Sequence, residues 1–342
     1  MRVLTTNANG LHDVLPIRSG QQVEIAQGLN VTYCRRVFRH TVSPMLAHLL
    51  PMYVRWADVV HLTAVYSFPT FPALLACKVL GKPMVWSPRG ALQRWSGSRR
   101  RAIKAVWEKA CRTMIPGSLI LHVTSEDEAT ESQCRFPGVH CVVIPNGIDI
   151  PEIVRHVPNS ERLRLLYLGR LHEKKGLENL LAACKLLLQT EWSLTIAGVG
   201  DPHYSKGLQE HICALNLSER VSMVGEVARD AKERVFEHAD VVVVPSFTEN
   251  FGIVVGEALA HGVPVIASTG TPWKCVEQVG CGLWVNNDPE SLAKAISCMS
   301  HMPLRDMGRR GREWIQEEFS WDPIAWDMKR IYQGMLECSK AK

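Results

Sequence analysis

Two glutamates, eight positions apart, are the side chains whose chemistry stands out in the segment SFTENFGIVVGEALAHG, residues 246–262. Glu249 precedes an apolar run and Glu257 lies inside it. Apolar residues cover every face of the helix predicted there, so we expect this helix to be buried all round. An unpaired buried carboxylate costs several kcal/mol. Three partners for Glu257 remain open: a salt bridge, a proton, or the hydroxyl groups of a ligand.

Two cations follow an earlier apolar run. Arg170 ends the segment LRLLYLGR, and Lys175 stands just before Gly176, where a helix is predicted to begin. The planar fork of an arginine, the point charge of a lysine and a helix N-terminus together favour a diphosphate-binding site. The alternative is that both side chains lie on a solvated turn.

A glycine loop, IAGVGD at residues 196–201, follows the next predicted strand. Compared with the dinucleotide-binding pattern G-x-G-x-x-G, it has His203 in place of the third glycine. The loop therefore gives only weak support to a nicotinamide-dependent dehydrogenase.

The elements that must position these residues alternate regularly after residue 162. Short β-branched or apolar runs predict buried strands, and the longer segments between them predict helices at 177–190, 205–215, 229–238, 252–261 and 289–301. This alternation is typical of a doubly wound parallel sheet. Ligands of such sheets bind beyond the carboxyl ends of the strands, where Arg170 and Glu249 are expected.

The first half of the chain repeats the pattern, with helices predicted near 70–80, 98–114 and 126–134. We therefore predict an α/β protein with two Rossmann-like domains that face a cleft. The N-terminal domain comprises residues 1–150, and the polar segment 151–162 is a linker. The second domain comprises residues 163–320, and a C-terminal helix, 321–342, packs back toward the N-terminal domain.

The composition is that of a globular protein without a membrane-spanning segment, because no run of eighteen apolar residues occurs. The eleven cysteines are scattered and form no C-x-x-C motif, which fits a reducing cytoplasm. Residues 1–150 carry 17 Lys and Arg against 9 Asp and Glu, a balance of +8. The segment Arg94–Arg112 holds seven of these cations and predicts a basic amphipathic helix. Such a helix suits an anionic membrane surface, although a solvated helix face is equally consistent; no nucleic-acid motif accompanies it.

Taken together, the segments PNGID, LGRLHEKKG, IAGVGD, VGEV and ADVVVVPSFTENFGIVVGEALAHGVPVIAS resemble glycosyltransferase family 4, whose members are retaining enzymes with the GT-B fold. The resemblance covers residues 140 to 335. Further segments, WSPRGAL, GTPWKCVEQVGCGLWV and FSWDPIA, are similar to a bacterial subgroup that builds surface polysaccharide or lipopolysaccharide. Trp273 of GTPW could line the donor side of the cleft or pack beneath a loop.

The resemblance implies a role for each candidate residue. Glu249 would contact hydroxyl groups of the donor sugar, Glu257 would accept from the ribose hydroxyls, and Arg170 and Lys175 would hold the donor diphosphate. The backbone amides that would cradle sugar and phosphate are those of Asn250, Phe251, Gly252, Ile253 and Val254. The residues that would lie at the nucleotide base are Gly198, Gly200 and Val227. No cofactor is expected, and no Asp-x-Asp motif indicates a metal.

The N-terminal domain departs from the family pattern. Residues 1–10 resemble its second strand, residues 11–29 are predicted to be irregular, and the usual first strand, glycine-rich loop and helix are expected to be absent. Arg89 stands where many relatives have a histidine, and we expect it, with His61, on the acceptor side. For His61 a purely structural role is the alternative.

The predicted function is that of a retaining hexosyltransferase. It would transfer a hexose from a nucleotide diphosphate sugar to a lipid-linked or polysaccharide acceptor in cell-surface glycan synthesis, at the inner face of the cytoplasmic membrane. The alternative is a catalytically impaired nucleotide-sugar-binding remnant, owing to the shortened N-terminal domain. A nucleotide-sugar epimerase finds no support in the motifs, and a glycosidase is disfavoured by the spacing of the two glutamates.

Overall fold

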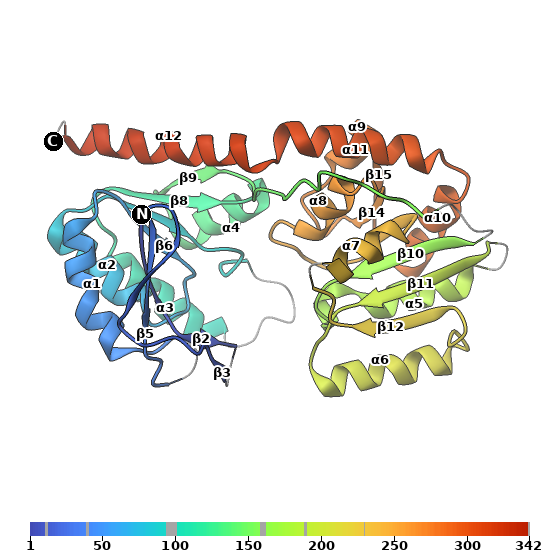
Figure 1. Cartoon of the computed structure of the whole chain (residues 1–342), viewed down its shortest axis with the longest axis horizontal. Coiled ribbons are helices and arrows are strands. Elements are labelled where there is room, and N and C mark those ends of the chain that lie inside the picture. The colour runs from blue at the N-terminus through green and yellow to red at the C-terminus, as the bar shows by residue number, and fades with distance from the viewer. Residues whose placement is uncertain are drawn as a thin grey trace. The chain divides into compact units, whose positions relative to one another are not determined.

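The computed structural model describes residues 1–10, 13–38, 41–93, 101–157, 162–187, 190–228 and 230–340. The chain divides into two compact units: unit 1 comprises Met1–Ile144 with Asp327–Lys342, and unit 2 comprises Pro145–Trp326 (Figure 1). The segment predicted as a linker, 151–162, therefore falls within unit 2.

Unit 2 is built on a six-stranded sheet in the order β12-β11-β10-β13-β14-β15, in which all neighbouring strands are parallel. The strands are β10 (Leu163–Leu168), β11 (Trp192–Ala197), β12 (Val221–Gly225), β13 (Val241–Val244), β14 (Val265–Ser268) and β15 (Gly282–Val285). Helices alternate with them: the 3₁₀ turn η1 (Glu173–Lys175), α5 (Leu177–Leu186), α6 (Pro202–Ala214), α7 (Asp230–Glu237), α8 (Ile253–Ala260), α9 (Cys275–Val279), α10 (Pro289–Met299) and α11 (Leu304–Glu318). Helix α12 (Trp321–Lys340) begins in unit 2 and, from Asp327 on, belongs to unit 1. The predicted doubly wound sheet is confirmed.

Both faces of this sheet are buried. In β13, Val241 and Val243 join one apolar cluster with residues of α5, α6 and α10, whereas Val242 and Val244 join another with residues of α7, α8 and α11. Side chains that alternate between two covered faces explain why β13 is an unbroken valine run. The loops at the carboxyl ends of the strands are consequently anchored to a sheet that is buried on both faces.

Unit 1 contains a four-stranded parallel sheet, β6-β7-β8-β9, and a separate three-stranded sheet, β1-β5-β4. The strands are β1 (Arg2–Thr6), β4 (Gln22–Ala26), β5 (Leu29–Cys34), β6 (Val60–Thr63), β7 (Met84–Ser87), β8 (Leu119–Val123) and β9 (His140–Val143), with a short hairpin of β2 (Ala8–Asn9) and β3 (Asp13–Val14). The helices are α1 (Pro44–Trp56), α2 (Thr70–Leu80), α3 (Arg101–Thr113) and α4 (Glu126–Arg135). They enclose a core around the fully buried Trp86, Leu121 and Phe136.

The prediction that residues 11–29 are irregular is wrong. Within that range, Gln22–Ala26 forms β4 and pairs antiparallel with β5. The segment QVEIA is mostly exposed in the structure, so it lacks the buried apolar run that marks the other strands. Its pairing depends on β5 rather than on its own hydrophobicity.

Candidate active site

The candidate donor residues of unit 2 lie in loops that leave the same edge of its sheet. Because all strands are parallel, their carboxyl ends meet at one edge. Arg170 and Lys175 lie between β10 and α5, and Glu249 lies between β13 and α8. The sequence therefore placed these three residues on the correct side of the fold.

Glu249 has partners within the protein. Its carboxylate forms an ion pair with the Lys175 ammonium group, and the Ser246 hydroxyl donates to the same carboxylate oxygen, Oε1, over 2.6 Å. The Glu249 side chain is 11% exposed and that of Lys175 is 20% exposed. The carboxylate is thereby paired and oriented, yet it remains reachable from solvent.

The backbone brings Lys175 to Glu249. Gly176 caps α5 with φ +66°, and a Cβ atom at this position would lie 2.0 Å from the carbonyl oxygen of Pro245. The amide of Phe247 also donates to the carbonyl of Lys174 over 2.9 Å. Only glycine allows the turn before α5 to lie against the end of β13, and this contact sets the ion pair.

Lys174 is a third cation of this cluster that the sequence analysis missed. Desolvation is the main cause of its lowered pKa; Lys175 and Arg170 lower it further, whereas Glu249 raises it. Arg170 itself is exposed, and its carbonyl oxygen accepts from the Tyr167 hydroxyl over 2.8 Å. The dipeptide Lys174-Lys175 was the signal, but sequence does not show which ammonium group meets Glu249.

Glu257 also has a protein partner. The ammonium group of Lys232 in α7 lies 2.5 Å from the Glu257 carboxylate. Of the three partners left open by the sequence, the structure therefore shows a salt bridge. The expectation that α8 is buried all round is wrong, because the Glu257 side chain is 19% exposed and Ile253 is 44% exposed. One face of α8 therefore borders solvent, and Glu257 lies along it. Lys232 could not be foreseen, since it reaches Glu257 from a different helix.

In the loop that leads into α8, some residues pack into the core and others leave their backbone accessible. Phe251 is buried against Trp273, with ring centroids 5.1 Å apart, so its side chain serves the core. Gly252 precedes α8 with φ +73° and offers its first turn no side-chain cap. Asn250 and Val254 are half-buried. The first turn of α8 thus has the character of an anion-binding helix N-terminus.

Gly198 and Gly200 have a structural reason to be glycine. A Cβ atom would lie 1.8 Å from the Gly169 carbonyl oxygen at the first position, and 2.0 Å from the Leu171 carbonyl oxygen at the second. The loop after β11 therefore packs backbone to backbone against the loop that carries Arg170. Any ligand contact at these positions must come from the main chain.

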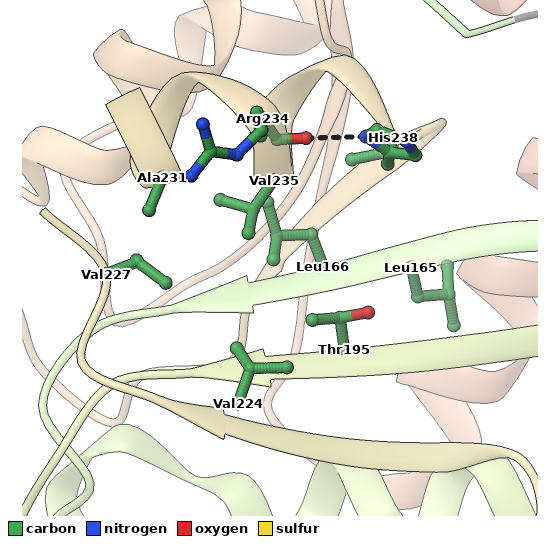
Figure 2. Close-up of a pocket in the computed structure, with 10 residues that line it drawn as sticks. Leu165, Leu166, Thr195, Val224, Val227, Ala231, Arg234, Val235 and His238 are labelled. Atoms are coloured by element: carbon green, nitrogen blue, oxygen red, sulfur yellow. Dashed lines mark hydrogen bonds between the residues drawn. The ribbon is translucent and has the colours of Figure 1, made fainter. Parts of the chain in front are cut away.

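Val227 lines a pocket of about 280 Å³ beneath α7. Figure 2 shows Val227 between the helix that carries Ala231 and Val235 and the strand that carries Val224. The lining is mainly apolar, with Thr195, Arg234 and His238 as its polar members. Of the residues predicted from sequence, Val227 alone lies in the lining of this pocket.

In unit 1, His61 belongs to a hydrogen-bonded chain. Its Nε2 lies 2.6 Å from the Ser87 hydroxyl, which lies 2.7 Å from Nδ1 of His122. Nδ1 of His61 lies 2.5 Å from the Tyr332 hydroxyl, and Nε2 of His122 lies 3.0 Å from the Ile144 carbonyl oxygen. The chain links β6, β7 and β8 to α12.

The direction of this chain follows from its end. The Ile144 carbonyl can only accept, so His122 carries its proton on Nε2 and accepts from Ser87 at Nδ1. Ser87 then accepts from His61 Nε2, and His61 Nδ1 accepts from Tyr332. Desolvation, then His122 and Arg89, lower the pKa of His61 to about 4, so its ring is neutral at pH 7. Both nitrogens of His61 are thereby engaged inside unit 1.

Arg89 lies beside this chain. It is exposed, and it lowers the pKa of both His61 and His122 by its charge. Its φ of +53° is unusual for a residue with a side chain. The next amide, that of Gly90, donates over 2.5 Å to the buried carboxylate of Glu128, which holds the turn in place. Arg89 is thus near enough to His61 to act on it by its charge, and the assignment of both residues to the acceptor side stays a prediction.

Within the residues that the structure describes, there is no cluster of three His, Cys, Asp or Glu residues that could hold a metal ion. Among the helices of the same ranges, none combines the length and apolar character needed to cross a bilayer.

Two family models match consecutive parts of the chain. The model described as Glycosyltransferase Family 4 matches residues 2–152, and the model described as Glycosyl transferases group 1 matches residues 150–314. With the parallel sheets and the Lys175–Glu249 site, these matches place the chain among the glycosyltransferases of the GT-B fold. Within that class it belongs to the family 4 type.

Individual proteins agree with this membership. The chain is similar to the GDP-mannose:cellobiosyl-diphosphopolyprenol alpha-mannosyltransferase of Xanthomonas campestris, with 28% identity over 84% of this chain and 76% of that protein. An uncharacterized glycosyltransferase of Methanocaldococcus jannaschii, MJ1607, is 34% identical, but the alignment spans 53% of this chain and about half, 47%, of that relative. The solved sucrose-phosphate synthase of Thermosynechococcus elongatus shares the fold, with a TM-score of 0.77, 22% identity and coverage of 98% and 89% of the two chains.

The histidine chain makes stability depend on pH. The pKa of His61 in the folded protein, about 4, lies below the ordinary 6.5, so the unfolded chain binds this proton first as the pH falls. The free energy of unfolding should therefore decrease as the pH falls from 6.5 to about 4. The lowered pKa of His122 acts in the same direction. Urea denaturation across this range measures the slope.

The matched variants are His61→Asn and His301→Asn, since His301 is exposed. The first should flatten the dependence of unfolding free energy on pH, and the second should leave it unchanged. Equal slopes for the wild type and His61→Asn would contradict the assigned chain.

Proposed function

We propose that this protein is a retaining glycosyltransferase that moves a hexose from a nucleotide diphosphate sugar to a lipid-linked or polysaccharide acceptor in cell-surface glycan synthesis. The observation that carries the proposal is the Lys175–Glu249 ion pair at the carboxyl edge of the unit 2 sheet. It combines an oriented carboxylate with a cation, at the edge where parallel sheets bind ligands.

Breaking the bond between the sugar and the diphosphate requires stabilisation of the departing phosphate charge. Arg170, Lys174 and Lys175 supply fixed positive charge, and the uncapped first turn of α8 adds backbone dipoles. On donor binding, Lys175 can share its three N–H groups between Glu249 and a phosphate oxygen. The residues present can thus provide this stabilisation themselves, and we propose that transfer is independent of metal.

Glu249 is proposed to accept from hydroxyl groups of the donor sugar. Its Oε1 already accepts hydrogen bonds from the Lys175 ammonium group and the Ser246 hydroxyl, so this oxygen is held in place. In a retaining reaction the acceptor enters on the side of the leaving group, through an oxocarbenium-like state. A carboxylate fixed beside the sugar stabilises that positive charge without itself moving.

The nucleotide part of the donor is assigned to the same edge. Glu257 is proposed to accept from the ribose hydroxyls, with the Lys232 ion pair holding the carboxylate in place. The base would lie at the loops of Gly198, Gly200 and Val227, where contacts come from the main chain.

For the acceptor we propose a group with a phosphate near its reactive end. Arg89 is exposed beside His61 and His122 and is held in its turn by the Gly90–Glu128 hydrogen bond. The name of the Xanthomonas relative specifies a diphosphopolyprenol acceptor. An arginine is well suited to such an anion.

A membrane-bound acceptor requires a surface that reaches the membrane. On α3, Ile103 is 65% exposed and Val106 is 70% exposed, and Arg101, Lys109 and Arg112 are exposed on the same helix. The remainder of the predicted basic segment, residues 94–100, lies outside the described residues. Exposed apolar side chains among cations are typical of a helix that lies on anionic lipid. We propose that α3 makes this contact, at the inner face of the cytoplasmic membrane.

Two substitutions in the ion pair test the donor site. Glu249→Ala should lower the rate of sugar transfer by about 100-fold or more, because a preorganised charge is lost, while nucleotide binding stays largely intact. Lys175→Ala should weaken both, with nucleotide affinity falling about 10-fold or more after loss of a charge-assisted contact. Steady-state kinetics with UDP-glucose and GDP-mannose, and calorimetry with UDP and GDP, measure these effects.

Glu210→Ala is the control, because Glu210 is exposed in a surface ion pair with Lys206. Normal turnover in Glu249→Ala would refute the assignment of the donor site. Nucleotide-sugar binding by the wild type without transfer to any lipid-linked or polysaccharide acceptor would favour a binding protein instead.

The proposed membrane surface predicts a second result. The wild type should sediment with vesicles that contain phosphatidylglycerol and not with pure phosphatidylcholine. The double variant Ile103→Glu/Val106→Glu should lose most of this binding, because two charges replace inserted apolar groups. Ile153→Glu, at a residue that is 71% exposed in unit 2, serves as the control. Equal sedimentation of all three proteins would contradict the assignment to α3.

A further inference from the structure

The loop that carries Glu249, residues 246–252, is hydrogen-bonded along one side to residues 268–273, which we term the strap. The Ser268 hydroxyl donates to the Ser246 carbonyl oxygen over 2.5 Å. The Glu249 amide donates to the Gly270 carbonyl oxygen over 2.8 Å. At the far end, the indole N–H of Trp273 donates to the Phe251 carbonyl oxygen. The strap therefore contacts the loop before, at and after Glu249.

The strap is itself fixed in place. The indole N–H of Trp284 donates to the Thr271 carbonyl oxygen over 3.1 Å, and the Thr271 hydroxyl donates to the Ser268 carbonyl oxygen over 2.8 Å. A Cβ atom at Gly270 would lie 2.4 Å from the carbonyl oxygens of both Ser246 and Phe247. The strap and the loop thus pack backbone to backbone, with no space for a side chain at Gly270.

Trp273 occupies the point at which the loop becomes α8. The residue is 2% exposed, and its ring lies 5.2 Å from that of Phe319 and 5.8 Å from that of Trp314, between centroids. A Cβ atom at Gly252 would lie 3.3 Å from the indole nitrogen. The indole therefore lies directly beneath the backbone that turns from Glu249 into the first turn of α8.

Trp314 is a useful comparison for Trp273, because it contributes to packing alone. It contributes to the same aromatic cluster, but its indole N–H has no hydrogen-bond partner within the described ranges. Trp273 differs because its N–H is directed at a carbonyl of the Glu249 loop. A buried N–H and a buried carbonyl that depend on each other fix the loop in one conformation.

We propose that Trp273 is a positioning residue for the donor sugar, acting through the Phe251 carbonyl on the orientation of Glu249. This inference rests on the proposed function of Glu249. It assigns to the tryptophan of the GTPW segment a role that neither its burial nor its sequence context states. A displacement of reacting groups by about 1 Å can cost about 100-fold in rate.

The test compares Trp273→Phe with Trp314→Phe, since each removes an indole from the same cluster. In Trp273→Phe, transfer from UDP-glucose or GDP-mannose should fall about 10- to 100-fold, whereas the affinity for UDP or GDP should change less than about threefold. Trp314→Phe should retain both. Replacement of Trp273 by benzothienylalanine, which substitutes sulfur for the N–H and keeps the ring, covers the case in which phenylalanine impairs folding.

A double-mutant cycle distinguishes positioning from general stability. The affinity for the nucleotide sugar is measured in Trp273→Phe, Glu249→Ala and the double variant. If Trp273 acts through Glu249, the double variant should bind no more than about twofold more weakly than Glu249→Ala alone. Additive losses, or equal effects of Trp273→Phe and Trp314→Phe, would overturn the proposal. A wild type that binds no nucleotide sugar would instead refute the proposed function, and the inference with it.

Discussion

The ion pair between Lys175 and Glu249 is the interaction on which the donor half of this protein depends. Two loops from different strands must bring opposite charges together in a half-buried place, where an unpaired carboxylate would be costly. The features around it serve that geometry. The parallel sheet brings the loops to one edge, Gly176 lets the Lys175 turn lie against β13, and the strap holds the Glu249 loop from the other side.

Sequence located this pair but not its surroundings. Glu249, Lys175 and Arg170 follow predicted strands, so the topology of a parallel sheet was enough to place them together. Lys232 and the chain through Ser87 and His122 were missed, because they depend on which helix or strand lies next to which side chain. Glu257 illustrates this limit. The burial predicted from sequence indicated that it needs a partner, but only the tertiary structure shows that the partner is Lys232.

The errors in predicting the fold have the same physical origin. Helices α1 and α11 were not predicted from the sequence. Helix α1 contains Pro51, and helix α11 contains Gly308 and Gly311, residues that weaken a helical pattern in sequence. In α11 these glycines are required by packing, since a Cβ atom at Gly308 would lie 1.8 Å from the Gly262 carbonyl oxygen. Strand β4 is largely exposed and pairs because β5 is beside it. Where local preference and tertiary contact disagree, the contact decides.

The most direct test of the central claim is a thermal-shift measurement of the wild type with UDP, GDP, ADP and their sugar conjugates. A ligand that binds only the folded state raises the unfolding midpoint by mass action. If the Lys175–Glu249 edge binds a nucleotide diphosphate sugar, one nucleotide and its sugar conjugate should raise the midpoint, and Lys175→Ala should reduce the shift. If no nucleotide or conjugate shifts the midpoint at millimolar concentration, the account of this site is wrong.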